Sequence, residues 1–249
     1  MIMNEAFNIE LAGVAVRIEP LYGFIREYCR GYITDKPESF TVSVSEEDIA
    51  AERSKSAAED RKEGIPQRDF RDSYLETLAV YRKIAEKMLD FDTILFHGSV
   101  IAVDGAAYMF TAKSGTGKST HTRLWREMLG DRAVMINDDK PLITISKSGI
   151  TAHGTPWDGK HRLSTNTVAP LKAVCVLERS EKNRIAEITK ADCYNMLVQQ
   201  VYKPTNPQKL IKTLQLIDRL AENVKLYRLG CNMQPEAAEI SFGKMSGNT

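Results

Sequence analysis

The sequence lacks the features that mark several protein classes. Its four cysteines, Cys29, Cys175, Cys193 and Cys231, lie far apart and form no CxxC pair, so no zinc ribbon or redox pair is encoded locally. We interpret them as small, buried or half-buried apolar residues. No segment approaches the roughly 18 apolar residues of a membrane span, and the N-terminus has no basic region followed by an apolar stretch. These absences predict a cytoplasmic protein with no membrane partner.

The chain also lacks a net charge of either sign. Lys and Arg number 34 against 33 Asp and Glu, for a formal charge of +1. No overall field therefore attracts nucleic acid or an anionic membrane, and we expect neither as a partner. With 249 residues, 43% of them hydrophobic, the chain can build one large domain, or one domain with an appendage.

The first part of the chain has the alternation of β-strands. Phe7 to Glu19 is rich in Val and Ile, and Ser39 to Val44 alternates more regularly. The polar stretch Glu46 to Arg71 has little apolar periodicity, which predicts a linker or exposed loop. We therefore divide the chain into a small α+β segment with a polar linker, residues 1–68, and a main domain, residues 69–249. The first segment has no chemical motif, and its role is open between substrate capture, a homo-oligomer contact and completion of the core.

The main domain alternates between helical and strand-like patterns, which is typical of α/β architecture. Asp104-Gly105 tolerates positive φ and predicts a hairpin turn between two strands. The predicted elements, in chain order, are a helix over 72–90, strands over 93–103 and 106–111, a helix over 117–129, a strand over 133–136, hairpin strands between 141 and 153, a strand over 171–178, helices over 191–202 and 207–224, and a strand over 225–229.

Residues 112–119, AKSGTGKS, match the P-loop, or Walker A, pattern. In such a loop consecutive backbone N–H groups point at phosphate oxygens, and the N-terminus of the following helix adds partial positive charge. Gly115 and Gly117 permit the bend, Lys118 can reach the terminal phosphates, and Ser119 can ligate Mg²⁺ through its hydroxyl.

Ala112 occupies the first position of this loop, where the usual pattern has glycine. The expected context is nevertheless present, because an apolar strand precedes the loop and an amphipathic helix follows it. The alternatives are a glycine-rich turn that holds no nucleotide and a dinucleotide-binding loop, which needs a third glycine that GTGKST lacks. We predict that the loop binds ATP, or another nucleoside triphosphate, with Mg²⁺. The predicted contacts are Ser114, Gly115, Thr116, Gly117, Lys118, Ser119 and Thr120.

Asp138 and Asp139 follow the next predicted strand, twenty and twenty-one residues after Lys118. In an α/β sheet this strand lies beside the P-loop at the carboxyl edge, which brings both carboxylates to the metal. Phosphoryl transfer needs a group that holds Mg²⁺ and, for a hydroxyl acceptor, commonly a carboxylate that takes its proton. Two adjacent aspartates can divide these roles. The alternative is a single Mg²⁺ ligand with a solvent-exposed neighbour.

His97 falls in the predicted strand ahead of the P-loop strand, with Gly98 beside it to allow a close approach to the backbone. A lone histidine in an apolar strand is more often a satisfied core residue. The functional alternative places His97 near the transferred phosphate, and the residues alone do not decide between the two.

The stretch His153 to Asn166, HGTPWDGKHRLSTN, predicts an irregular loop dense in groups that bind phosphate or a polar acceptor. We assign Lys160, His161 and Arg162 to substrate binding, and Trp157 can supply a wall. The alternative is a plain surface loop with a Pro-Trp anchor. Two histidines spaced by eight residues in a loop are a weak metal signal and stay unassigned.

Four features together carry a resemblance to a known family: HG at 97–98, the strand hairpin, SGTGKS at 114–119 and NDD at 137–139. They resemble the catalytic domain of HPr kinase/phosphorylase, a bacterial protein serine kinase with a P-loop, over about residues 93–142. The resemblance implies the P-loop kinase fold shared with phosphoenolpyruvate carboxykinase, a mixed twisted sheet with flanking helices.

The same resemblance implies roles for individual residues. Lys118 and Ser119 bind phosphate and Mg²⁺, Asp138 is the catalytic base toward a serine hydroxyl, Asp139 helps to hold the metal, and His97 stands beside the reacting phosphate. Thr120 departs from the family, which has an acidic residue at this position. The family's later arginine-rich, glycine-rich signature, which handles phosphoserine and phosphorolysis, is not found, and the loop GTPWDGKHRLSTN looks like that of divergent kinase homologues found beside peptide-modification genes. Neither HPr as acceptor nor the reverse phosphorolysis is therefore implied.

Three functions fit these patterns. The first is a kinase that moves the γ-phosphoryl group of ATP to a hydroxyl, favouring serine, on a small protein, a peptide or a small molecule. The second is a nucleotide-gated adaptor with little or no transfer, which Ala112 and Thr120 favour. The third is a small-molecule enzyme of the carboxykinase type, for which the sequence has no recognisable metal and carboxylate-substrate motif.

Overall fold

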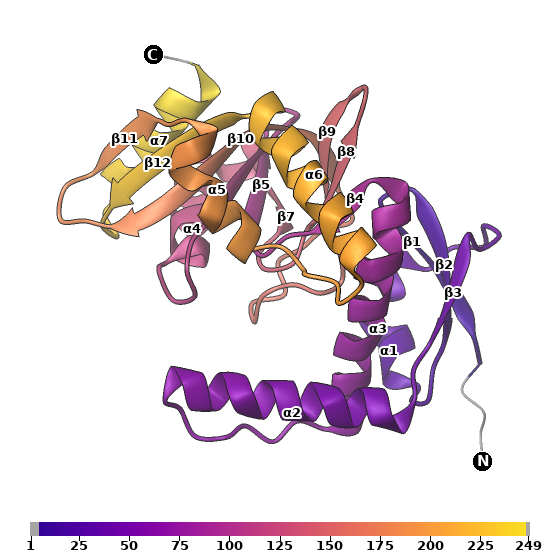
Figure 1. The fold of residues 1–249 in the computed structure, drawn as a ribbon. Helices are drawn as coiled ribbons and strands as arrows, with labels where there is room; N and C mark the ends of the chain where they lie inside the picture. Colours follow the sequence, from indigo (N-terminus) through magenta and orange to yellow (C-terminus); the bar gives the residue numbers. More distant parts are fainter. Residues whose placement is uncertain (1–4, 248–249) are drawn as a thin grey trace. The chain divides into compact units, whose positions relative to one another are not determined.

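A computed structural model describes residues 5–247, and the chain forms two compact units, Met1–Lys87 and Met88–Thr249 (Figure 1). The division predicted at residues 68 and 69 falls inside the first unit, and the domain assignment built on it stays a prediction. No helix within residues 5–247 has the length and apolar character needed to cross a membrane.

The first unit is a small α+β unit with a three-stranded sheet. The sheet has the order β1-β2-β3, with β1 and β2 antiparallel and β3 parallel to β2. The predicted strands in this part are thus confirmed. The elements are β1 (Phe7–Leu11), β2 (Val14–Glu19), α1 (Phe24–Tyr28), the 3-10 turn η1 (Arg30–Tyr32), β3 (Phe40–Ser43), α2 (Glu46–Glu63) and α3 (Asp72–Met88).

The stretch Glu46 to Arg71 was expected to be a linker or exposed loop. Helix α2 corrects this for residues 46–63, whereas residues 64–71 form no helix or strand. The N-terminus of α2 has a reciprocal cap, in which Asp48 N donates to Ser45 Oγ and Ser45 N donates to Asp48 Oδ2. Its buried Glu52 accepts hydrogen bonds from Arg82 of α3. Caps and ion pairs, not an apolar stripe, stabilise this helix, and apolar periodicity therefore did not detect it.

The second unit is a mixed α/β fold with helices on both faces of a mixed sheet. Its elements are η2 (Leu89–Phe91), β4 (Thr93–Leu95), β5 (Ser99–Val103), β6 (Ala106–Thr111), α4 (Lys118–Leu129), η3 (Gly130–Arg132), β7 (Ala133–Asn137), β8 (Leu142–Ser146), β9 (Gly149–His153), β10 (Val168–Arg179), β11 (Arg184–Glu187), α5 (Lys190–Gln199), α6 (Pro207–Asn223), β12 (Lys225–Cys231) and α7 (Glu236–Ser246). The predicted mixed sheet and flanking helices are confirmed, whereas β11 and α7 were not predicted.

The large sheet has the order β4-β8-β9-β10-β6-β5-β7, and β12 joins it beside β10. Strand β10 is long enough to pair first with β9, antiparallel, and then with β6 and β12, both parallel. Strand β5 runs antiparallel to β6 on one side and to β7 on the other. The carboxyl ends of β6 and β7 and the beginning of β5 therefore meet at one edge of the sheet.

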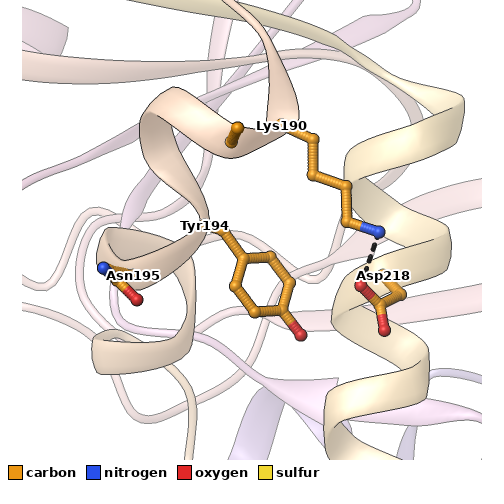
Figure 2. Close-up of a pocket in the computed structure, with 5 residues that line it drawn as sticks. Lys190, Tyr194, Asn195 and Asp218 are labelled. Atoms are coloured by element: carbon orange, nitrogen blue, oxygen red, sulfur yellow. Dashed lines mark ion pairs between the residues drawn. The ribbon is translucent and has the colours of Figure 1, made fainter.

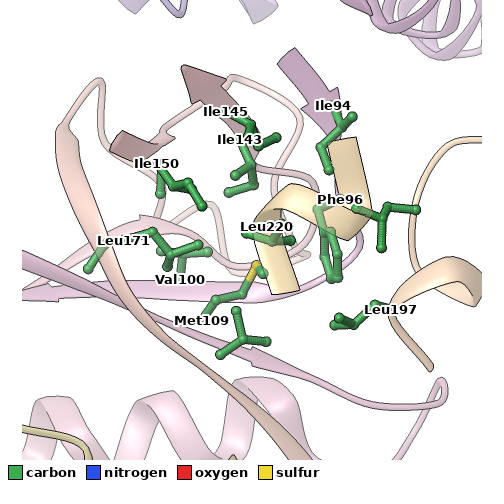
Figure 3. Close-up of a cluster of buried hydrophobic side chains, with 14 of the residues drawn as sticks. Ile94, Phe96, Val100, Met109, Ile143, Ile145, Ile150, Leu171, Leu197 and Leu220 are labelled. Atoms are coloured by element: carbon green, nitrogen blue, oxygen red, sulfur yellow. The ribbon is translucent and has the colours of Figure 1, made fainter. Parts of the chain in front are cut away.

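Two apolar layers lie on opposite faces of this sheet, because successive strand residues point to opposite sides. On β5 and β6, Val100 and Met109 belong to the layer that includes Leu197 of α5 and Leu220 of α6 (Figure 3). The alternate residues belong to the layer that includes Trp125 of α4 and several residues of α7. Helices α5 and α6 thus cover one face, and α4 and α7 cover the other (Figure 1).

The strand predicted over 93–103 is broken at His97. Strand β4 pairs with β8, whereas β5 pairs with β6 and β7, so the chain changes partners between them. Gly98 permits the change, because a Cβ there would lie 3.1 Å from Phe110 O. The break leaves His97 at the sheet edge and outside regular strand structure.

Helix α4 is anchored to α7 through a buried polar contact. His121 Nε2 lies 3.0 Å from Ser241 Oγ, and Trp125 Nε1 donates to the same oxygen at 2.8 Å. Burial lowers the pKa of His121 to about 4. The four cysteines are free, with three buried and Cys231 half-buried, as predicted.

The low pKa of His121 predicts a loss of stability in mild acid. Below pH ~6.5 the imidazole of His121 is protonated in the unfolded chain, whereas in the folded chain it stays neutral down to about pH 4. The free energy of unfolding therefore falls as the pH is lowered through this window and is unaffected above it. The expected loss from His121 is about 2 kcal/mol at pH 5. Urea unfolding of the wild type and of His121→Gln at pH 7.5 and 5.0 measures it. An equal pH dependence in the two proteins contradicts the assignment, since the similarly shifted His153 is present in both.

Candidate functional site

The shared edge of β5, β6 and β7 forms a cleft of about 700 Å³. Three elements contribute to it: the glycine-rich loop between β6 and α4 (residues 112–117), the pair Asp138 and Asp139 after β7, and His97 before β5. Strand β5 lies between β6 and β7 in the sheet, and the end of β7 still lies at the same edge as the glycine-rich loop, as predicted. The lining residues are His97, Gly115, Gly117, Lys118, Ser119, Thr120, Thr122, Arg123, Arg126, Met135, Asp138, Asp139, Gly159, Lys160, His161 and Leu163.

The glycine-rich loop turns sharply before α4. Gly115 and Gly117 have φ values of 73° and 119°, a region that glycine enters without strain. Ala112 does not have positive φ and is fully buried in the apolar layer beneath α4, so this position needs no glycine. Among the predicted contacts, Ser114 and Thr116 do not line the cleft, whereas the other five do.

Lys118 is a buried cation at the first position of α4. Its Nζ donates to Ala112 O at 3.2 Å. Burial lowers the pKa of Lys118, although the nearby charges of Asp139 and Asp138 oppose this effect. A buried ammonium at a helix N-terminus, beside a turn rich in backbone N–H groups, fits the binding of an anion such as phosphate.

Arg179, at the end of β10, fixes the glycine-rich loop from the neighbouring strand. One of its guanidinium nitrogens donates to Gly115 O at 2.6 Å. The contact spans 64 residues, and no local sequence pattern signals it. Arg179 was not predicted to belong to the site.

Asp138 is held by a chain of hydroxyl groups. Ser99 Oγ donates to Asp138 Oδ1 at 2.6 Å and lies 3.0 Å from Thr122 Oγ1. Because the Ser99 proton goes to Asp138, Thr122 is the donor to Ser99, and its Oγ1 lies 3.3 Å from Lys118 O in the first turn of α4. Asp138 is only 5% exposed yet lines the cleft, so the carboxylate is fixed in place and still accessible from one side. Neither Ser99 nor Thr122 was predicted.

Asp139 and His97 form the second polar pair of the cleft. His97 Nε2 lies 3.3 Å from Asp139 Oδ1, and Gln200 Oε1 lies 2.8 Å from His97 Nδ1. Burial raises the pKa of Asp139, but the hydrogen bond from His97 and the charges of Lys140, His97 and Lys118 outweigh it and hold the pKa below its usual value. His97 is therefore an oriented residue of the cleft and not a core residue.

The loop from residue 154 to 167 is tied to β7. Asn137 Nδ2 donates to Thr155 and Trp157, while Asn137 Oδ1 accepts from the backbone N–H groups of Asp139 and Lys140. Asn137 thus positions both the aspartate pair and the loop. Trp157 is 1% exposed and does not line the cleft, so it anchors the loop and forms no wall.

The three predicted substrate-binding residues do not all reach the cleft. Lys160 and His161 line it, whereas Arg162 lies outside the lining and pairs with Asp158 at 3.8 Å. Gly159 packs against the carboxylate of Asp138, since a Cβ there would lie 3.1 Å from Oδ2. The loop therefore places Lys160 and His161 in the same cleft as Asp138.

A second hollow, of about 610 Å³, lies between α5 and α6 (Figure 2). Its lysine, Lys190, pairs with Asp218 at 2.5 Å and with Glu222 at 2.9 Å, and both carboxylates raise the pKa of Lys190. The positive charge of Lys190 is therefore neutralised by two carboxylates of α6. Within residues 5–247 no group of three or more His, Cys, Asp or Glu side chains is arranged to hold a metal ion.

A family model described as SynChlorMet cassette protein ScmC matches residues 68–235. The chain belongs to the ScmC family. The matched range contains every residue that lines the cleft of this ScmC-family protein. No curated protein matches its sequence.

Among solved structures, the Hpr(Ser) kinase/phosphatase from Coxiella burnetii is similar to this chain. The two share 11% sequence identity with a TM-score of 0.35, over 62% of this chain and 93% of that chain. A TM-score of this size does not establish a shared function. The resemblance to HPr kinase/phosphorylase therefore stays a prediction.

Proposed function

We propose that this ScmC-family chain is an ATP- and Mg²⁺-dependent kinase that transfers the γ-phosphoryl group to a hydroxyl, favouring serine. The observation that carries the proposal is the convergence of Lys118, Asp138 and the His97–Asp139 pair on one cleft at the N-terminus of α4. Phosphoryl transfer needs mainly positioning and electrostatic stabilisation, and this arrangement supplies both.

The nucleotide phosphates are assigned to the glycine-rich loop and the buried ammonium of Lys118, whose desolvation an anion would compensate. Ser119 and Asp139 are the groups assigned to Mg²⁺. Their hydroxyl and carboxylate oxygens are the donors that this ion prefers. Bound Mg²⁺ supplies neutralisation of the charge on the transferring phosphate.

Asp138 is assigned as the general base. The acceptor oxygen forms a bond to the γ-phosphorus, the bond to the leaving oxygen of ADP breaks, and the hydroxyl proton goes to the carboxylate of Asp138. The hydrogen bond from Ser99 occupies one carboxylate oxygen, so the carboxylate is already oriented. His97, oriented by Gln200 and Asp139, is assigned a place beside the reacting phosphate.

A nucleotide-gated adaptor is the second candidate, because Thr120 lines the cleft where the resembled family has a carboxylate. Incubation with γ-labelled ATP, Mg²⁺ and a library of serine peptides and small hydroxyl compounds separates the two functions. The kinase proposal expects a labelled product and loss of label in Asp138→Asn. Tight, persistent ATP binding with no labelled product in any arm contradicts it in favour of the adaptor.

Arg179 gives a more local test of the nucleotide site. Arg179→Ala removes the hydrogen bond that fixes Gly115, so the loop must be ordered on binding, and we expect the affinity for Mg²⁺·ADP to fall about 3- to 10-fold. Titration calorimetry measures it. Arg184→Ala, in the exposed strand β11, is the matched control and keeps the wild-type affinity. An unchanged affinity in Arg179→Ala would remove this residue from the site.

A further inference from the structure

The outer part of the cleft is lined by basic side chains from two separate elements. Arg123 and Arg126 come from α4, whereas Lys160 and His161 come from the loop after β9. The geometry points to an anionic acceptor, a hydroxyl compound that carries carboxylate or phosphate groups near its hydroxyl. This inference rests on the proposed function, because it assigns the acceptor to the same cleft.

The spacing on α4 places the two arginines on the acceptor side of the cleft. Ser119, Arg123 and Arg126 follow one face of the helix, at i, i+4 and i+7. At ~1.5 Å per residue, Arg126 lies about 10 Å along the axis from Ser119. The phosphates assigned to the glycine-rich loop lie at the other end of this face. Arg126 is thus placed to meet a second anion.

The loop adds its basic groups to the same cleft from a second element, directly after the glycine that packs against the proposed base. Gly159 packs against Asp138, and the next two residues, Lys160 and His161, line the cleft. The loop backbone is fixed, because Thr165 Oγ1 donates to Met135 O at 2.8 Å. A negative group bound by Lys160 or His161 would therefore occupy the same cleft as the carboxylate of Asp138, the proposed base.

The acidic groups of the cleft do not neutralise its two arginines and Lys160. Asp138 accepts from Ser99, and Asp139 interacts with His97 and Lys140. Arg123 forms an exposed pair with Glu127 on its own helix, which contributes little. Within residues 5–247 no carboxylate forms an ion pair with Lys160 or Arg126, so both remain able to bind an anionic acceptor. The positive charge of these side chains also disfavours the binding of a basic acceptor.

Binding of three probes to the protein saturated with Mg²⁺·ADP tests the inference. The probes are a serine peptide flanked by Asp, the same peptide flanked by Asn, and glycerol 3-phosphate. We expect the Asp peptide to bind about tenfold more tightly than the Asn peptide at low salt, with a smaller difference at high salt. Displacement of the Asp peptide by glycerol 3-phosphate identifies a compact anion site. Its failure to displace identifies an extended acidic segment, and both outcomes support an anionic acceptor.

Charge reversal assigns the effect to the cleft. Lys160→Glu and Arg126→Glu should each reduce the preference for the Asp peptide to about threefold or less, with ADP affinity unchanged. Lys147→Glu reverses another exposed lysine, in the β8–β9 turn and outside the cleft, and should keep the preference.

Several results would overturn the inference. These are equal affinity for the two peptides, no binding of any probe up to about 1 mM, the same effect in Lys147→Glu as in Lys160→Glu, or loss of ADP affinity in the reversed variants, which would assign the cations to the nucleotide. The readout is binding, so a protein that prefers the Asp peptide and transfers no phosphate supports this inference and contradicts the kinase. A protein that phosphorylates both peptides and binds them with equal affinity supports the kinase and contradicts this inference.

Discussion

Asp138→Asn is expected to lower phosphoryl transfer about 10³-fold while the affinity for Mg²⁺·ADP stays within about threefold of the wild type. The amide cannot take the hydroxyl proton. Its oxygen can still accept the hydrogen bond from Ser99, so the cleft should keep its geometry. Transfer is measured as label moved from γ-labelled ATP to the acceptor, and affinity is measured by calorimetry.

Asp131→Asn provides the matched control for this variant. Asp131 is an exposed aspartate in η3 and does not line the cleft, so transfer should be unchanged. Near-wild-type transfer in Asp138→Asn would show that Asp138 is not the base. The hydroxyl proton would then have to leave by another route, and the proposed division of roles between the two aspartates would be wrong.

Lys118→Ala is expected to weaken the affinity for Mg²⁺·ATP by about 30- to 100-fold and to abolish detectable transfer, because charged hydrogen bonds to phosphate are lost. The same variant should not destabilise the free protein. The ammonium is buried against a single backbone carbonyl, at a cost that its lowered pKa reflects, so its removal should leave the melting temperature unchanged or higher.

Lys113→Ala is the control for Lys118→Ala, because it removes an exposed lysine from the same loop. A large fall in melting temperature for Lys118→Ala alone would mean that the lysine has a structural role. Equal loss of nucleotide affinity in Lys118→Ala and Asp138→Asn would contradict the division between a phosphate-binding lysine and a catalytic base.

The sequence predicted the main domain well where local patterns are strong. The Asp104-Gly105 turn has positive φ at both residues, as the hairpin between β5 and β6 requires. The glycine-rich loop leads into a helix that begins at Lys118, as the strand–loop–helix context predicts. Both features depend on a few adjacent residues, and such features can be derived from the sequence alone.

The arrangement of the cleft was only partly predictable. We expected the strand ends at one edge of the sheet to bring Lys118 and Asp138 together, and both residues line the cleft. The residues that fix His97 and the glycine-rich loop do not follow from the sequence, because Gln200 reaches His97 across 103 residues and Arg179 reaches Gly115 across 64. Such contacts are set by the packing of α5 and β10 on the sheet.

Two of the wrong expectations, for Trp157 and for helix α2, have clear physical reasons. Trp157 follows a proline in a polar loop, a context that fits both a surface and a core position. The side chain is buried, because burying its large apolar ring is favourable. Helix α2 was missed because it has almost no apolar stripe, whereas the carboxylates of Asp48 and Glu52 pair with basic residues of α3. Ion pairs between helices are not visible in apolar periodicity.

A crystal structure of the chain with Mg²⁺ and a non-hydrolysable ATP analogue would show whether the cleft binds the nucleotide. We expect triphosphate density along residues 114–120, with Lys118 Nζ on the terminal phosphates, the metal near Ser119 and Asp139, and Asp138 facing the open side of the γ-phosphate. An analogue bound elsewhere, or a glycine-rich loop that stays empty at saturating analogue, would contradict the account.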